Sequence, residues 1–314
     1  MVAADSIDVV VPTFRRPADL ARCLRGLAAQ ALQPAHVVVV VRCGDDDSAR
    51  IASQHGAETV WVQAPGVVAA MTAGVARTTS PLVAITDDDA VPRPEWLAGL
   101  SRHLEDPSVG AAGGRDIVEG DEATNDKPVG AVTWWGRHAG NHHRGTGSAR
   151  DVSVLKGVSM LVRAEAFAFP PPRLLQGDGA EVHLEIVTCT SLRLQGLRVV
   201  YDPQVIVEHY PGVRHDDDAR GRQSARATRN AAYNLVIGTS ASHPRRRPLH
   251  VFAGLLFGER DAPGLVRTVV ALVRREQDVV SRFMPSARGR ASALWRWRMR
   301  PTGLVYPRAP AAPA

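Results

Sequence analysis

The amino-terminal part of the chain alternates between short apolar runs and longer segments in which apolar residues recur at helical spacing. The segments with helical spacing predict helices, as Leu20, Leu24 and Leu27 illustrate. The apolar runs are rich in β-branched residues and predict strands at residues 7–14, 37–41, 59–62 and 82–86. Four strands alternating with helices predict an α/β fold, doubly wound around a mainly parallel central sheet.

The fourth of these strands runs directly into three carboxylates, Asp87, Asp88 and Asp89. Side chains alternate along an extended chain, so Asp87 and Asp89 are expected to point one way and Asp88 the other. Ligands of open α/β sheets bind at this edge. Two carboxylates on one side repel each other unless a cation lies between them, and oxygen ligands suit Mg²⁺ or Mn²⁺ with a phosphate. The alternative is a solvated acidic turn that caps the next helix.

Further along the chain, the pattern predicts two more sheet strands and one long helix. The strands cover residues 109–118 and 205–210, and the helix opens near Gly177 and runs to Gly196. Residues 119–150 are polar, rich in Gly, His and Trp, and without a clear period. A loop of this length inside a compact domain indicates a functional segment, and a surface flap packed by its tryptophans is the alternative.

Composition narrows the class of protein. A chain of 314 residues with 45% hydrophobic content can bury the core of one or two globular domains. Cys23, Cys43 and Cys189 have no paired spacing, which argues against disulfides or a zinc site and favours a reducing compartment. Neither a signal segment nor an apolar stretch of about 18 residues is visible, so a cytoplasmic location is expected.

Two motifs carry a resemblance to a known family. The first strand ends in Val11-Pro12-Thr13-Phe14-Arg15-Arg16, and the fourth is followed by Asp87-Asp88-Asp89-Ala90-Val91-Pro92. In their order and spacing they resemble the family 2 glycosyltransferases, inverting enzymes of GT-A fold that use nucleotide-diphosphate sugars. The resemblance covers residues 7–215. A third segment, Leu155-Lys156-Gly157-Val158-Ser159-Met160, is similar to the family's Lys-Gly-x-Asn-Met, and its glycine would allow close approach of a bound sugar.

The resemblance implies a donor site at the ends of the strands. Asp87 and Asp89 would bind Mn²⁺ or Mg²⁺, and His209, at the end of the last strand, matches a family histidine that completes the metal shell. The implied contacts with the nucleotide sugar are Pro12, Thr13, Arg15, Asp45, Asp87, Asp88, Gly157 and Arg214. Arg214 or Arg220 would clamp the diphosphate, because a guanidinium group matches phosphate oxygens bidentately.

The resemblance also implies a carboxylate base on the long helix. The family carries a Glu-Asp pair there, and counting back from Gly196 places the Asp on Glu185 and the Glu on Leu184. Glu185 is therefore the predicted base that takes the proton of the acceptor hydroxyl. Glu181, expected one helical turn earlier, is the alternative base.

Departures from the family pattern leave two other functions open. Ser159 and Thr72 stand where the family has Asn, and Arg42 stands where it has Asp. One alternative is therefore a catalytically impaired protein that binds nucleotide sugars. The other is a nucleotidyltransferase on a similar fold, which would need a Gly-rich phosphate loop after the first strand, where Pro12-Thr13-Phe14-Arg15 has no glycine.

The carboxyl-terminal part of the chain differs in charge and pattern. Residues 241–300 hold thirteen arginines and four acidic residues, a net charge of +9 in a chain of +6, so the remainder carries −3. Residues 265–283 alternate Val and Leu with Arg, which predicts a basic amphipathic helix. We expect a catalytic domain at 1–215, a helical basic extension at 216–300 and a disordered tail at 301–314.

The basic extension, together with Trp295 and Trp297, predicts peripheral binding to the anionic inner face of a membrane. In the first alternative, the helix packs its valines on the catalytic domain and leaves its arginines in solvent. In the second, the basic surface binds nucleic acid, which is disfavoured because the aromatics cluster at one end and the body is acidic. A lipid-linked or cell-envelope glycan and a natural product all remain open as acceptors, and the oligomeric state does not follow from the sequence.

Overall fold

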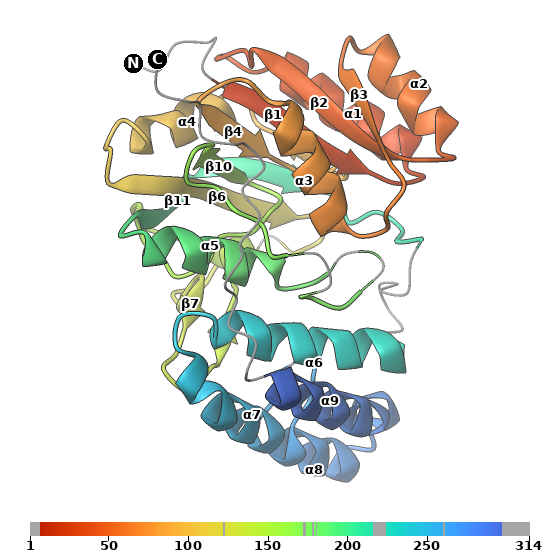
Figure 1. Ribbon diagram of the computed structural model, residues 1–314, viewed down its shortest axis with the longest axis vertical. Coiled ribbons are helices and arrows are strands. Elements are labelled where there is room, and N and C mark those ends of the chain that lie inside the picture. Colours follow the sequence, from red (N-terminus) through yellow and green to blue (C-terminus); the bar gives the residue numbers. More distant parts are fainter. Residues whose placement is uncertain are drawn as a thin grey trace.

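A large sheet with helices on both faces forms the centre of the computed structural model (Figure 1). The structure describes residues 7–121, 123–171, 174–177, 179, 181–215, 224–259 and 261–296. The tail predicted at 301–314 lies outside these residues, as do Arg220 and Trp297.

Within the described residues, the central sheet has nine strands in the order β3-β2-β1-β4-β10-β6-β11-β5, and β9 pairs with β11. The strands are β1 (Ile7–Thr13), β2 (His36–Arg42), β3 (Glu58–Val62), β4 (Leu82–Ile85), β5 (Ala90–Pro92), β6 (Val109–Val118), β9 (Arg150–Asp151), β10 (Met160–Arg163) and β11 (Arg198–His209). Six strands run in one direction, whereas β5, β9 and β10 run against their neighbours. The doubly wound, mainly parallel sheet is thus confirmed; the short strands β5 and β9 were not predicted.

Two helical layers bury the two faces of the sheet. α1, α2 and α4 contribute to one apolar core and α3 and α5 to the other. In β1, Val9 and Val11 enter the first core and Val10 the second, which is why central strands read as unbroken apolar runs. The helices are α1 (Pro17–Ala28), α2 (Asp46–Gln54), α3 (Val67–Arg77), α4 (Trp96–His103), α5 (Leu184–Leu194), α6 (Ala225–Thr239), α7 (Arg247–Leu256), α8 (Leu265–Val273) and α9 (Gln277–Trp295), with short 3₁₀ helices η2 (His142–Arg144) and η3 (Pro244–Arg246).

The segment predicted as one irregular loop, residues 119–150, contains a small hairpin and η2. The hairpin pairs β7 (Ala131–Val132) with β8 (His138–Ala139). Its turn reaches the carboxyl-terminal helices, because the ring of Trp135 lies 5.9 Å from that of Phe257. His250 Nε2 lies 3.2 Å from the carbonyl oxygen of Trp134 in the same turn. The hairpin therefore connects the sheet domain to the helical extension.

Helices α6 to α9 pack together at the end of the molecule beyond α5 (Figure 1). α6 and α9 approach closely at Gly289, where an added Cβ would lie 2.2 Å from the carbonyl oxygen of Arg229. The single helix predicted over 265–283 is wrong: α8 ends at Val273, Arg275 takes a left-handed φ of 58°, and α9 begins afterwards. Among the described residues, no helix combines the length and apolar character needed to cross a bilayer.

Candidate functional site

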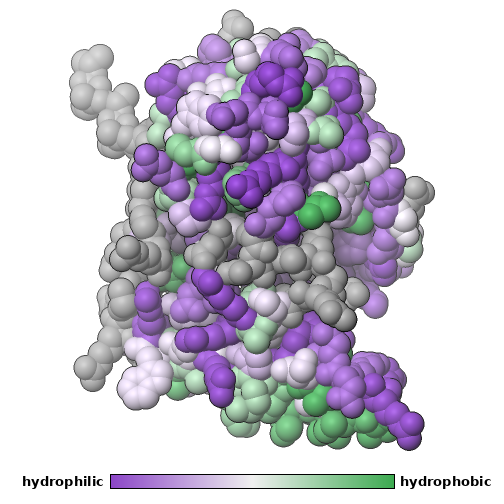
Figure 2. All heavy atoms as spheres, turned by 90° about the vertical axis from the view of Figure 1, so that its right-hand side faces the viewer, coloured by the Kyte–Doolittle hydropathy of each residue, from purple (hydrophilic) through white to green (hydrophobic). Residues whose placement is uncertain are grey.

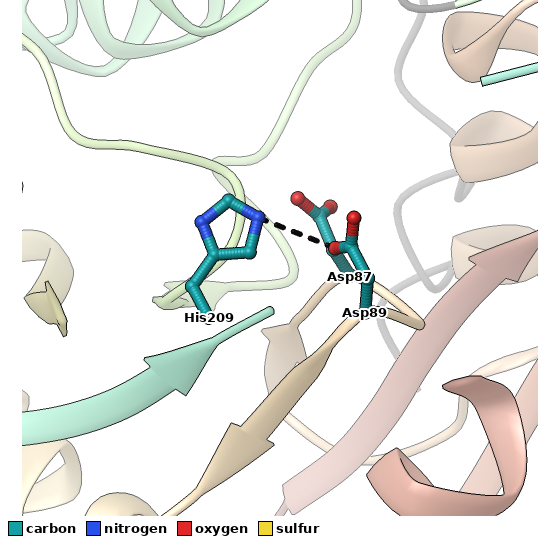
Figure 3. Close-up of side chains that lie close together, drawn as sticks. All are labelled: Asp87, Asp89 and His209. Atoms are coloured by element: carbon teal, nitrogen blue, oxygen red, sulfur yellow. Dashed lines mark ion pairs between the residues drawn. The ribbon is translucent and has the colours of Figure 1, made fainter. Parts of the chain in front are cut away.

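Asp87, Asp89 and His209 meet at the edge of the sheet (Figure 3). One ligand atom from each side chain lies within 4.8 Å of the others. The two aspartates follow β4, and His209 ends β11, whose antiparallel pairing with β5 puts it opposite Ala90. His209 Nε2 lies 3.3 Å from Asp89 Oδ1. The structure therefore brings together the three side chains that the sequence proposes as metal ligands.

Asp88 points the other way, as the alternation of side chains predicts. Its buried carboxylate accepts a hydrogen bond from Thr13 Oγ1 at 2.6 Å and pairs with Arg16 Nη2 at 2.6 Å. Burial raises the pKa of Asp88 to about 7, although the charge of Arg16 opposes the rise. Asp88 thus ties the end of β1 to the acidic turn. In this structure the Asp88 carboxylate is buried and engaged, and its predicted contact with the nucleotide sugar stays a prediction.

Arg16, not Arg15, is the arginine that enters the site. Its Nη1 lies 3.0 Å from Asp89 Oδ2, so one guanidinium group bridges Asp88 and Asp89. Arg15 takes a left-handed φ of 55°, its N–H donates to Asp45 at 2.5 Å, and its guanidinium group lies 5.1 Å from the Phe14 ring centroid. Because the backbone reverses at Arg15, the side chain of Arg16 faces the cavity. The predicted donor contact through Arg15 stays a prediction, while the structure brings Arg16 to the cavity.

Asp45 also has a structural role. It is the N-cap of α2, where its side chain accepts the Ser48 N–H at 3.3 Å as well as that of Arg15. Capping by Asp satisfies a backbone donor that the helix leaves open. Asp45 is buried and both of its oxygens are engaged, and its predicted contact with the nucleotide sugar stays a prediction.

The charge state of Asp89 is set by its neighbours. Burial alone would raise its pKa, but His209 and Arg16 outweigh burial and lower it, and the Gly212 N–H donates to Oδ2 at 2.9 Å. The pKa of the adjacent Asp87 is raised by burial and by the charge of Asp89. The pair thus combines a firmly ionised carboxylate with one that a cation would help to ionise.

Asp116, on β6, supports the cluster from behind. Its Oδ2 lies 3.4 Å from His209 Nδ1 and pairs with Lys156 Nζ. Burial opposes the ionisation of Asp116, yet these two partners lower its pKa to about 2. Burial likewise opposes protonation of His209, but Asp116 and Asp89 raise its pKa. Asp116 was not predicted as a site residue, although a single carboxylate inside an otherwise apolar strand could have indicated a functional role.

A cavity of about 350 Å³ opens over the cluster. Of the predicted site residues, it is lined by Pro12, Thr13, Asp87, Asp89, Gly157, Glu185 and Arg214. Residues that the sequence did not single out for the site also line it, among them Phe14, Arg16, Met71 and His183. A second cavity of about 390 Å³ near Arg193 and Arg198 contains none of the clustered carboxylates. The cavity over Asp87 and Asp89 is therefore the candidate active site.

Glu185 reaches this cavity from the first turn of α5. The helix begins at Leu184, later than the start near Gly177 that the sequence predicts. The Gly157 N–H lies 3.4 Å from Glu185 Oε1, and both residues line the cavity. Burial raises the pKa of Glu185, and the charge of Asp87 adds to the rise. The structure therefore places one carboxylate apart from the metal cluster but in the same cavity.

Glu181 does not lie on α5 and does not line the cavity. It takes a left-handed φ of 39°, and its Oε2 accepts the Val68 N–H at 2.8 Å near the start of α3. Gly66 makes room for it, because an added Cβ there would lie 2.4 Å from the same oxygen. A carboxylate at this end of α3 satisfies an open donor and suits the helix dipole. This position favours Glu185 over Glu181 as the predicted base.

The comparison with protein families decides the family. A model described as glycosyltransferase like family 2 matches residues 4–230. The chain belongs to this family. Curated relatives include uncharacterized glycosyltransferases of Mycobacterium tuberculosis and Mycobacterium bovis, each 30% identical over 133 residues. That match covers 42% of this chain and 54% of the relative, so the chain spans about half the length of the curated relatives.

Solved structures show the fold of this glycosyltransferase-like chain. A mannosyltransferase of Pyrobaculum calidifontis, in complex with GDP-Man and Mn²⁺, superposes with a TM-score of 0.53 at 17% identity, over 92% of this chain and 87% of the other. Mannosyl-3-phosphoglycerate synthase of Rubrobacter xylanophilus gives a TM-score of 0.51 at 17% identity, over 77% and 75%. These likenesses confirm the predicted GT-A fold.

Proposed function

We propose that this protein transfers a sugar from a nucleotide-diphosphate donor to an acceptor hydroxyl, with inversion at the anomeric carbon and with help from Mn²⁺ or Mg²⁺. The observation that carries the proposal is one cavity lined by Asp87, Asp89 and Glu185. Solved structures of similar fold were obtained with GDP-Man and Mn²⁺, and with UDP and Mg²⁺. Membership of the glycosyltransferase-like family supports the same reaction class.

The donor set of the cluster fits a divalent ion. Two carboxylates and one imidazole offer hard or borderline ligands, and their atoms lie within 4.8 Å of one another. Within the described chain, His209 Nε2 is buried without a hydrogen-bond partner and faces the aspartates. A bound ion would supply positive charge to the diphosphate leaving group. Asp116 would fix the His209 ring so that Nε2 stays turned toward the aspartates.

Other side chains of the cavity would bind and orient the substrates. Pro12 and Thr13, at the end of β1, would contact the nucleotide, and Arg214 would clamp the diphosphate bidentately. Gly157 presents only backbone to the cavity, which would let the sugar approach closely. Glu185, which lines the same cavity, would take the proton of the acceptor hydroxyl as it attacks the anomeric carbon.

The basic helical extension supports a location for this reaction. Residues 241–300 carry a net charge of +9, and an anionic surface attracts each exposed arginine by about 1 kcal/mol. We therefore propose peripheral association with the inner face of a membrane, where a lipid-linked or cell-envelope acceptor would be met. A natural product is the alternative acceptor. In that case the helical extension would only pack against the sheet domain and would not bind a membrane.

A panel of UDP-, GDP- and dTDP-sugars tests the proposed reaction. We expect isothermal titration to detect one donor whose binding requires Mn²⁺, and product analysis by NMR to show an inverted anomeric linkage. Binding without transfer would identify a nucleotide-sugar-binding protein instead. Release of the sugar 1-phosphate, with transfer of the nucleoside monophosphate to the acceptor, would identify a nucleotidyltransferase.

Replacement of Asp116 tests the support behind His209. Asp116→Asn keeps the shape of the side chain but leaves Lys156 uncompensated beside the cation site. We expect a 10- to 100-fold loss of Mn²⁺ affinity, measured by electron paramagnetic resonance, since the partners of metal ligands contribute on about that scale. Asp151→Asn is the matched control, because that exposed carboxylate pairs with Arg198 far from the cluster. Unchanged Mn²⁺ affinity in the Asp116 variant would contradict the assigned role.

A further inference from the structure

Helix α8 turns its large apolar side chains outward. Their exposed fractions range from 44% to 81%, and they form the α8 face: Leu265, Val266, Val269, Val270, Leu272 and Val273. The residues that α8 buries are the small or polar Thr268 and Ala271. Figure 2 shows apolar side chains gathered along the end of the molecule that the carboxyl-terminal helices form. The pattern is the reverse of an ordinary surface helix, which buries its apolar stripe.

The α8 face is continuous. At 3.6 residues per turn, its six side chains cover an arc of about 160° on the helix. Arg267 and Arg274 border this arc, and Arg275 follows directly, all three exposed. Single exposed apolar residues are common, but a contiguous face of this kind marks a binding surface. The alternative in which the valines of this helix pack on the catalytic domain is therefore contradicted.

The charge around the α8 face decides between a bilayer and a second copy of this chain. A symmetric dimer through this face would bring Arg267 and Arg274 of one copy near those of the other. An anionic bilayer instead offers phosphates to the arginines and an apolar interior to the valines and leucines. α8 has nine residues and spans about 14 Å, too short for a bilayer core of about 30 Å. It can lie along a membrane surface but not cross it.

We propose that the α8 face is the surface by which this protein lies on an anionic membrane. Its apolar side chains enter the boundary between headgroups and acyl chains, and Arg267, Arg274 and Arg275 contact lipid phosphates. Phe252 and Phe257, also largely exposed, add apolar surface from the neighbouring α7 segment. The proposal rests on the peripheral association proposed above and assigns it to particular residues.

Vesicle flotation tests the apolar part of the surface. The full chain should float with vesicles of phosphatidylcholine and phosphatidylglycerol and float less with phosphatidylcholine alone. The double variant Val269→Asp/Val273→Asp should partition at least about tenfold less, because burial of a single valine side chain already contributes on that scale. The matched control is Leu194→Asp: Leu194 ends α5 as Val273 ends α8, and it is 63% exposed. That control should float like the wild type.

Charge reversal tests the arginines separately. Arg267→Glu/Arg274→Glu should lose the preference for anionic vesicles, and added salt should weaken wild-type binding in the same way. Arg50→Glu on α2 is the control, since Arg50 is exposed on the sheet domain. Mn²⁺-dependent donor binding should be the same in all these variants, because none of the substituted residues lines the catalytic cavity.

The outcomes separate the α8 face from the broader proposals. If the wild type floats and the α8 variants float equally well, membrane association stands and its assignment to α8 is overturned. If the wild type never floats, both are overturned, while donor binding still reports on the transfer reaction. A wild-type dimer that Val269→Asp/Val273→Asp converts to a monomer, without flotation, would make the α8 face a contact between copies.

Discussion

Asp89→Ala is expected to abolish metal-dependent donor binding. Asp89 is the most connected group of the cluster, because its carboxylate contacts Arg16, His209 and the Gly212 N–H. Its lowered pKa keeps it ionised at neutral pH, so it contributes a full negative charge toward a cation. We expect Mn²⁺ affinity to fall by more than about 100-fold, since even partners behind a metal ligand contribute 10- to 100-fold.

A second substitution separates loss of charge from loss of structure. Asp89→Ala also leaves Arg16 and His209 without a buried partner, which costs stability. Asp89→Asn keeps the side-chain shape and removes only the charge. Asp47→Asn is the control, because Asp47 belongs to the other Asp-Asp-Asp run and is exposed on α2. Titration of Mn²⁺ and donor into each folded variant, checked by circular dichroism, decides the matter. Unaltered donor affinity in Asp89→Asn would exclude the metal site.

The strands of the sheet could be predicted because each strand carries its own signal in its local sequence. β1, β2 and β4 are buried on both faces, so their sequences are unbroken runs of β-branched and apolar residues. Gly66, with a φ of 105°, precedes α3 and marks its start at Val67. The alternation of Asp87, Asp88 and Asp89 followed from the geometry of an extended chain.

Where the observed site differs from the predicted one, the difference depends on single residues at which the backbone reverses. The left-handed conformation at Arg15 decides which of two adjacent arginines faces the cavity, and no propensity distinguishes them. Left-handed conformations at Glu181 and His183 delay the start of α5, which removes Glu181 from the helix. Such residues are held by contacts formed elsewhere, here by the start of α3, so their local sequence gives no sign of them.

Two further features depend on tertiary packing. Asp116 meets His209 only because β6 and β11 pair in parallel, a contact between strands 93 residues apart. The sequence also did not predict that the apolar side of α8 faces outward, because an amphipathic pattern does not say which side of a helix faces the protein. α8 buries only Thr268 and Ala271 and lies against α9.

Glu185→Gln should retain donor binding and lose turnover by about 100-fold or more, the usual contribution of a positioned base. Glutamine keeps the size of the side chain and the contact with the Gly157 N–H but accepts no proton. Glu181→Gln is the matched control and should retain turnover, because Glu181 holds α3 and does not line the cavity. If Glu181→Gln lost turnover while Glu185→Gln kept it, the assignment of the base would be reversed.

The pH profile gives an independent measure of the same residue. Burial raises the pKa of Glu185 above its usual 4.5, and a base must be ionised to act. Turnover of the wild type should therefore be full above this raised pKa and should fall as the pH drops through it, at a higher pH than an exposed glutamate would give. In Glu185→Gln, the residual turnover should lose this acidic limb. Stopped assays with saturating donor and Mn²⁺ give kcat at each pH, and an acidic limb that persists unchanged in the variant would assign the titration to another group.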